Sequence, residues 1–111
     1  MMVSLNRVIV SGSLRTIPQL VFESGRKRAT FFMCSKDYYR NKDGKMAHND
    51  TFLTVITYGK LAENCAKYLT DGKCVMVEGK LGNHGNVIAS SVVFLENEKP
   101  ETEQKVEGSD E

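Results

Sequence analysis

The segment from residue 51 to residue 72 changes its hydrophobic period, and this change restricts what the chain can fold into. In Thr51–Tyr58 the side chains alternate: Leu53 and Val55 face one way, and the other face shows two aromatic rings. A period of two is typical of a strand with one buried face. In Lys60–Leu69 apolar residues recur at spacings of three or four, as along one side of a helix. Asp71-Gly72 then ends that helix, because glycine suits the left-handed cap position.

Shorter patterns on both sides of this segment predict further strands. Gly12 permits a bulge or bend in the first strand, and the polar residues 37–50 indicate a hairpin tip or mobile loop. Five strands with one helix between the third and the fourth is the order of an OB fold, a Greek-key barrel of the all-β class. Besides Thr51–Tyr58, we expect strands at Leu5–Arg15, Ala29–Lys36, Cys74–Leu81 and Val87–Phe94, with an extended stretch at Gln19–Glu23 and a tight turn at Gly82–Asn86.

The charge is distributed unevenly along the 111 residues, although the net charge is only +1. Residues 1–95 hold 13 basic and 7 acidic side chains, a balance of +6, whereas residues 96–111 hold 2 basic and 7 acidic ones, a balance of −5. The last segment has almost no apolar residues to offset its ordering entropy. We therefore expect one domain at 1–95 that binds polyanions, followed by a short disordered acidic tail at 96–111. A soluble domain with a solvated tail explains the charge alone equally well.

Several classes of function are disfavoured by what the sequence lacks. No apolar run approaches the roughly 20 residues that span a bilayer, and the N-terminus does not resemble a signal peptide, so we expect a cytoplasmic protein without membrane contact. The three cysteines have no CxxC spacing and lie in apolar patterns, which favours buried, reduced thiols over a zinc site with His48 or His84. The sequence shows no nucleophile motif, no phosphate loop and no paired carboxylates near a histidine. We therefore expect that the protein is not an enzyme and binds neither a cofactor nor a metal.

Aromatic rings and cations alternate around the polar loop and the strand that follows it. The loop region carries Lys36, Tyr38, Tyr39, Arg40, Lys42 and Lys45, and the exposed face of the next strand adds Phe52 and Tyr58. Such a surface suits single-stranded nucleic acid, because unpaired bases stack on rings while cations follow the phosphates. The alternative is that the rings are core and the cations a solvated face. That alternative is stronger for Phe31 and Phe32, since one of two strand neighbours must point inward.

The sequence resembles the bacterial single-stranded DNA-binding proteins over most of residues 5–95. The resemblance begins with LNRVIVSGSL and continues through PQLVF, SGRKRATFFMC, YGKLAENCAKYL, DGKCVMVEGKL and SSVVFLE. Its strongest part is Thr51–Leu81, where an aromatic-Gly-Lys strand end leads into the helix and a VEGKL strand. The resemblance implies a protein that coats and protects single-stranded DNA during replication, recombination and repair, without regard to sequence and as a homotetramer at the nucleoid.

The resemblance also assigns roles to individual residues. It places Tyr39, Phe52 and Tyr58 at base-stacking positions, and Arg7, Arg40 and Lys60 at phosphate-contacting ones. Combined with the pattern of rings and cations, this predicts a DNA-binding surface made of Arg7, Lys36, Tyr38, Tyr39, Arg40, Lys42, Lys45, Phe52, Thr54, Tyr58, Lys60 and Lys80.

Three features depart from the family pattern. There is no Trp, so any stacking uses the smaller rings of Tyr and Phe. The Gly82–Asn86 turn is shorter than usual, and Arg26, Lys27 and Arg28 stand where small or apolar residues are common. The chain stops without the terminal Phe that recruits replication and repair proteins in the family, so we expect that contact to be absent. The competing hypothesis is an OB-fold accessory protein of a primosome or translation complex, which predicts fewer rings on the third strand.

Overall fold

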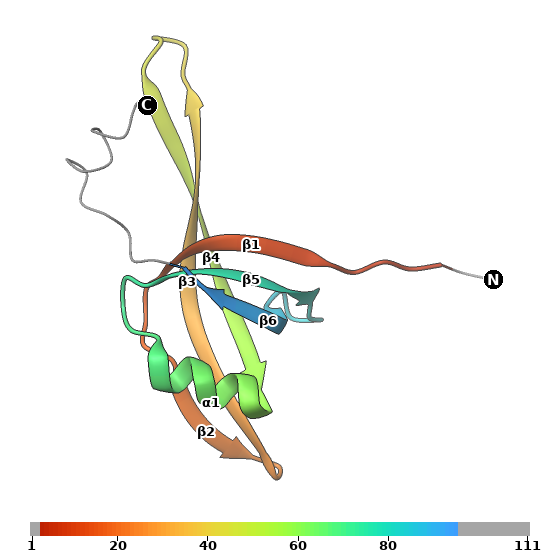
Figure 1. Ribbon diagram of the computed structural model, residues 1–111. Coiled ribbons are helices and arrows are strands. Elements are labelled where there is room, and N and C mark those ends of the chain that lie inside the picture. Colours follow the sequence, from red (N-terminus) through yellow and green to blue (C-terminus); the bar gives the residue numbers. More distant parts are fainter. Residues whose placement is uncertain (1–2, 96–111) are drawn as a thin grey trace.

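The strands β3 and β4 form a hairpin that is much longer than the rest of the sheet, and the other elements assemble around its lower half (Figure 1). The computed structural model of the chain describes residues 3–95. The elements are β1 (Val8–Leu14), β2 (Gln19–Glu23), β3 (Arg26–Arg40), β4 (Met46–Tyr58), α1 (Gly59–Tyr68), β5 (Cys74–Leu81) and β6 (Val87–Phe94).

This order confirms the predicted barrel with one helix between the third and fourth of the expected strands. The bounds of β5 and β6 agree with the prediction to the residue. The extended stretch at Gln19–Glu23 is a short edge strand, β2, which pairs with the start of β3. The first strand begins at Val8 rather than at Leu5.

The prediction of a loop at residues 37–50 was wrong in extent. Strand β3 continues to Arg40 and β4 begins at Met46, so only residues 41–45 form the turn. Residues 35–50, which are the paired ends of β3 and β4 with the turn between them, extend beyond the barrel as a twisted ribbon, which we call the arm (Figure 1). Both faces of the arm are open to solvent, and its polar sequence therefore lacks the apolar alternation by which a half-buried strand is recognised.

The cap predicted for the helix was also misplaced. Helix α1 ends at Tyr68, and its C-cap residue is Leu69, in extended conformation, with its N–H bonded to the carbonyl of Cys65. Gly72 does adopt the left-handed conformation, at φ 88°, but in the separate turn that leads into β5.

Two short seams close the barrel. On one side Ser13 and Leu14 of β1 pair with Cys34 and Met33 of β3. On the other, Val55 and Ile56 of β4 pair in parallel with Val87 and Ile88 of β6. Strands β1, β5 and β6 thus form one half of the barrel, and β2, β3 and β4 form the other, with α1 packed chiefly against β3 and β4.

The core lies between these halves and consists of apolar side chains from nearly every element. Its fully buried members include Leu14, Phe31, Met33, Val55, Cys65, Leu69, Val75, Val77 and Val87. As predicted, Cys34 and Cys65 are buried, whereas Cys74 is only half-buried. Burial raises the pKa of the Cys65 thiol to about 11, although a hydrogen bond with Thr57 acts in the opposite direction.

The prediction of a disordered tail at residues 96–111 lies outside the described residues. Within residues 3–95, no helix is long and apolar enough to cross a membrane. The same part of the chain contains no cluster of three or more His, Cys, Asp or Glu side chains that would hold a metal ion.

Candidate nucleic-acid interface

The side of β3 and β4 that faces away from the core runs without interruption from the barrel to the tip of the arm. Directly paired residues in antiparallel strands point to the same side, and neighbours along a strand point to opposite sides. The register of β3 and β4 therefore assigns a continuous set of side chains to the side opposite the core, which we call the outer face. It comprises Arg28, Tyr58, Thr30, Ile56, Phe32, Thr54, Cys34, Phe52, Lys36, Asp50, Tyr38, His48, Arg40 and Met46. Cys34 is the one member of this set that is buried.

Two phenylalanine rings form the centre of the outer face. Phe32 and Phe52 stack with their ring centroids 5.7 Å apart and an interplanar angle of 4°. Both rings remain partly open to solvent, whereas the neighbouring Phe31 is buried in the core. The expectation that one of the two adjacent phenylalanines points inward is confirmed, and the other one lies on the outer face.

Further rings lie on both sides of this pair. Tyr38, on the arm, meets the imidazole of His48 edge-on at a centroid distance of 5.6 Å. Tyr58, at the barrel end, is covered by the guanidinium of Arg26, which lies 4.0 Å above its ring centroid. The four rings of Tyr38, Phe52, Phe32 and Tyr58 thus lie along one side of one hairpin.

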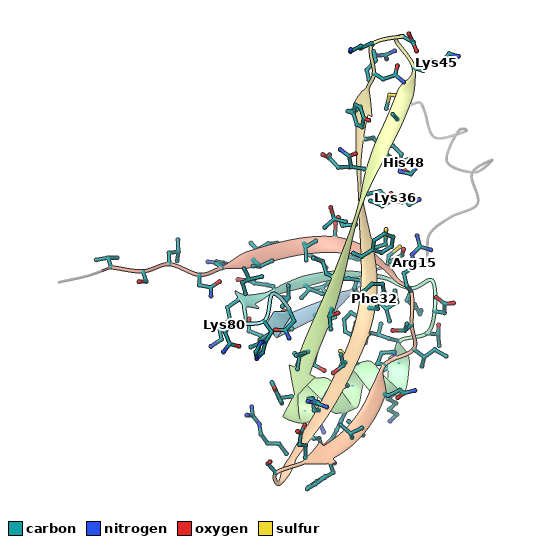
Figure 2. The ribbon with its side chains drawn as sticks, turned by 180° about the vertical axis from the view of Figure 1, so that it is seen from behind. Arg15, Phe32, Lys36, Lys45, His48 and Lys80 are labelled. Carbon is teal, nitrogen blue, oxygen red and sulfur yellow. The ribbon has the colours of Figure 1, made fainter. Side chains whose placement is uncertain are left out.

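Cations border this row of rings, although one carboxylate, that of Asp50, lies among them. Lys36 lies opposite Asp50 in the register, and Asp50 Oδ1 accepts a hydrogen bond from His48 Nδ1 at 2.7 Å. Arg15 follows the β1–β3 seam and lies beside Phe32, whose carbonyl accepts the backbone N–H of Arg15 at 2.7 Å. A side-chain hydrogen bond with Cys34 raises the pKa of Arg15 above its usual value. Figure 2 shows Lys36 and His48 along the arm, with Arg15 and Phe32 at its base.

The structure brings together only part of the surface that the sequence predicts. Lys36, Tyr38, Arg40, Phe52, Thr54 and Tyr58 share the outer face. Lys42 and Lys45 lie in the turn at the arm tip, where Arg40 Nη1 donates to the carbonyl of Gly44 at 2.7 Å. Lys60 is exposed in the first turn of α1. Tyr39 pairs with Ala47 and so points to the opposite side of the arm from Tyr38.

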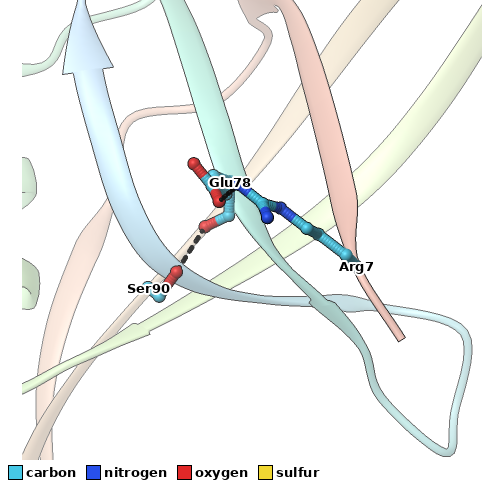
Figure 3. A network of polar contacts seen from close by, with 3 residues as sticks. All are labelled: Arg7, Glu78 and Ser90. Atoms are coloured by element: carbon cyan, nitrogen blue, oxygen red, sulfur yellow. Dashed lines mark hydrogen bonds and ion pairs between the residues drawn. The ribbon is translucent and has the colours of Figure 1, made fainter. Parts of the chain in front are cut away.

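Arg7 and Lys80 lie elsewhere, on the β1–β5–β6 half of the barrel. Arg7 forms an ion pair with Glu78, whose backbone carbonyl accepts the Ser90 hydroxyl at 3.1 Å (Figure 3). Lys80 lies with Arg7 at a cavity of about 410 Å³, far from the arm (Figure 2). The sequence shows neither the partner of Arg7 nor the separation of these two cations from the rings.

Among the rings and cations of this surface, Phe32 and Arg15 were not predicted from the sequence, and Arg26 was noted only as a departure from the family pattern. A signal for Phe32 existed, because Ala29, Phe31 and Met33 are the apolar set of one strand face, which leaves Phe32 on the other. Of the three consecutive basic residues at 26–28, Lys27 points to α1, where its Nζ lies 2.6 Å from Glu63 Oε2. The positive charge and the hydrogen bond of Lys27 lower the pKa of Glu63. Arg28 binds Glu23 at 2.8 Å.

Comparison with known proteins identifies relatives of this chain. Residues 5–91 match the single-strand binding protein family. A "single-stranded DNA-binding protein" of Clostridium tetani is 32% identical over 105 residues, covering 83% of this chain and 71% of that protein. A "single-stranded DNA-binding protein 1" of Staphylococcus aureus is 32% identical over 114 residues, covering 91% of this chain and 72% of that protein.

Solved structures share the fold at lower sequence identity. A Plasmodium falciparum SSB, solved in complex with ssDNA, superposes with a TM-score of 0.74 at 20% identity, covering 86% of this chain and 99% of that one. The single-stranded DNA-binding protein of Thermus aquaticus, as a deletion mutant, gives 0.72 at 23% identity, covering 83% of this chain and 51% of that one. The solved structures show the fold, whereas the family match over residues 5–91 and the two relatives at 32% identity show that the chain belongs to the single-strand binding protein family.

Proposed function

We propose that this protein binds and coats single-stranded DNA, without regard to sequence, during replication, recombination and repair in the cytoplasm, at the nucleoid. The observation that carries this proposal is the row of four rings on one face of the β3–β4 hairpin, bordered by Arg15, Lys36 and Arg40. Stacking on a ring tolerates any base, because every base has a π-face, and the cations follow the backbone phosphates. Nothing in this face calls for bond-making chemistry, so we propose a binding protein and not an enzyme.

The competing function, an OB-fold accessory protein of a primosome or translation complex, is not favoured. It predicts few rings on the third expected strand, whereas Phe52 and Tyr58 lie there and Phe32 stacks on Phe52 from the neighbouring strand.

Titration with oligo-dT, duplex DNA and single-stranded RNA of equal length tests the proposal directly. We expect tight binding to oligo-dT, weak binding to duplex, and a fall in tyrosine fluorescence as bases stack on Tyr38 and Tyr58. If about four cations contact phosphates, the plot of log affinity against log salt has a slope of about −3 for a single strand. Equal affinity for duplex and oligo-dT contradicts the proposal.

We further propose that four copies assemble, and the β1–β5–β6 half offers a surface for this. Ile9, Met76 and Val93 are 60%, 39% and 45% exposed and lie on neighbouring strands, on the side away from the core. The pairing of β1 with β3 starts only at Ser13, so the edge of β1 before that residue is open to another strand.

Light scattering on a sizing column tests this assembly. We expect a mass about four times the 12.4 kDa of one chain, and Ile9→Lys should reduce it to that of a dimer or monomer, because a charge is costly in an apolar contact. Ile17→Lys is the matched control, since Ile17 is 59% exposed on the other half of the barrel. A wild-type protein that is monomeric at micromolar concentration contradicts the tetramer.

The acidic segment at residues 96–111 should compete with DNA for the basic domain. A tethered polyanion acts at high effective concentration, so its deletion should tighten oligo-dT binding at low salt. Charge screening acts over about 8 Å at physiological ionic strength, and the gain should therefore shrink as salt rises. Identical affinities of residues 1–95 and the full chain at low salt would show that the segment does not compete.

A further inference from the structure

Two cysteines line one small cavity where the base of the arm meets β1 and β5. Ser13 of β1 pairs with Cys34 of β3 on one side and with Cys74 of β5 on the other. Directly paired residues point to the same side of a sheet, so both thiols face the same way. A cavity of about 160 Å³ lies over them, and we call it the thiol cavity. Its lining residues are Gly12, Ser13, Cys34, Lys36, Tyr38 and Cys74.

The three cysteines of the chain differ in how well a reagent can approach them. Cys65 lies in the core, where burial raises the pKa of its thiol to about 11, so that it stays protonated near neutral pH. Cys34, at the floor of the thiol cavity, is only 1% exposed. Cys74 lines the same cavity but is half-buried, so part of it is open to solvent. Cys74 is therefore the cysteine whose position suits reaction with a molecule from solution.

The register of the strands disfavours an internal disulfide between the two thiols of the cavity. Cys34 and Cys74 lie on either side of Ser13, so their Cα atoms are two strand spacings apart, roughly 9 to 10 Å. A disulfide requires Cα atoms within about 7 Å of each other. Cys34 therefore cannot attack a mixed disulfide at Cys74 unless β1 leaves the sheet, and such an adduct persists until an external thiol removes it.

Two cations favour an anionic partner for the thiol cavity. Arg15 donates a side-chain hydrogen bond to the Cys34 sulfur at the cavity floor. Lys36 lines the cavity and has no ion-pair partner among the described residues, since the carboxylate of Asp50 is bonded to His48 instead. Cationic neighbours stabilise a thiolate, which is the form that attacks a disulfide. They also attract the carboxylates of an anionic reagent.

The size of the thiol cavity fits only one end of such a reagent. Its volume is that of about five water molecules in the liquid, which admits a sulfur atom and a few carbon atoms. The carboxylates of a larger thiol would remain outside the cavity, on the outer face that Lys36 shares with Tyr38. The cavity thus offers a place for the sulfur and a cation for the charge.

We propose that Cys74 is a thiolation site, at which a small anionic disulfide such as glutathione disulfide forms a reversible mixed disulfide. The Cys74 thiol loses its proton to water, and the thiolate attacks one sulfur of the reagent. A new S–S bond forms between that sulfur and Cys74 Sγ, the old S–S bond breaks, and its electron pair leaves with the departing thiolate. Cys74 is oxidised and the departing thiol is reduced. Lys36 holds a carboxylate of the attached group.

Incubation of the full chain with glutathione disulfide, followed by peptide mass mapping, tests the site. We expect one glutathionyl group per chain, at Cys74, with Cys34 and Cys65 unmodified in the folded protein. Cys74→Ser should take up none, and thermal melting verifies that its barrel is intact. A native protein that stays unmodified, or one that reacts at Cys34 or Cys65 before Cys74, overturns the proposal.

Reagents of opposite charge test the role of Lys36. The rates of reaction with anionic glutathione disulfide and with cationic cystamine are each divided by the rate of the same reagent with mercaptoethanol. This normalised rate should be higher for the anionic reagent, and Lys36→Gln should reduce the preference severalfold. Lys42→Gln is the matched control, because Lys42 lies in the turn at the arm tip. A preference that Lys36→Gln and Lys42→Gln change equally, or not at all, overturns the site as proposed.

The effect on DNA binding rests on the proposed function and has its own test. The attached group brings carboxylates to the face that binds phosphates and occupies Lys36. The affinity of the thiolated protein for oligo-dT should therefore fall about fivefold or more at low salt, and a reducing thiol should restore it. Thiolated protein that binds as tightly as reduced protein overturns this regulation. A reduced protein that does not bind oligo-dT overturns the proposed function, whereas the mass mapping still decides the site.

Discussion

Phe52→Ala should weaken binding to oligo-dT about fivefold to 150-fold while leaving the stability of the barrel almost unchanged. Loss of one stacked base costs about 1 to 3 kcal/mol, and Phe52 is 53% exposed, so little core packing is lost. The effect should lie at the upper end of this range, because the partner ring of Phe32 also loses its support. Fluorescence titration at fixed salt measures the affinity, and thermal melting measures the stability.

Two matched variants make this result specific. Tyr68 is also 53% exposed, but it lies on α1 away from the outer face, so Tyr68→Ala should leave the affinity unchanged. Lys36→Ala should instead change the slope of log affinity against log salt concentration. Its magnitude should fall by about 0.7, which is the contribution of one phosphate contact on a single strand. If Phe52→Ala lowered the melting temperature and left the affinity intact, the ring would be a structural residue and the outer face would lose its central contact.

Gly12→Ala should destabilise the protein by roughly 3 kcal/mol or more, near the upper limit for single substitutions. A Cβ at this position would lie 2.1 Å from the backbone carbonyl oxygen of Cys34, and no side-chain rotation relieves a clash with backbone. The β1–β3 seam at Ser13 must then separate. For a domain of this size we expect the melting temperature to fall by more than about 10 °C.

Ser11→Ala is the control for this substitution, since it changes an exposed small residue in the same strand. It should alter the melting temperature by no more than a few degrees. A Gly12→Ala variant as stable as Ser11→Ala would show that β1 and β3 are not held as closely as the seam requires.

The half-buried strands could be predicted from the sequence because burial marks one of their faces. Val75, Val77 and Val87 point into the core while their neighbours face outward, and the bounds of β5 and β6 follow from that alternation. Gly12 was expected to mark a bend or bulge, but β1 pairs with β5 through Gly12 without a register shift. The structure gives a different reason for a glycine there: the close approach of the Cys34 carbonyl.

The arm and much of the candidate site could not be predicted for the same physical reason. Residues 37–40 and 46–50 are exposed on both faces, so no periodic burial distinguishes a strand from a loop. The side of the arm on which Tyr38 or Tyr39 lies depends on the register of β3 and β4. The pairing of Arg7 with Glu78, and of Arg28 with Glu23, depends on contacts between strands that a linear pattern does not record.

The two seams determine the order in which the barrel can assemble. The β3–β4 and β5–β6 hairpins join residues close in the chain, and such hairpins form within about 1 to 10 μs. The seams join residues that are distant in the chain, as in the pairing of Val55 with Val87, and each has only two residue pairs to offset the entropy of closing its loop. Folding should therefore be limited by closure of the barrel, at the slow rates typical of proteins dominated by non-local contacts.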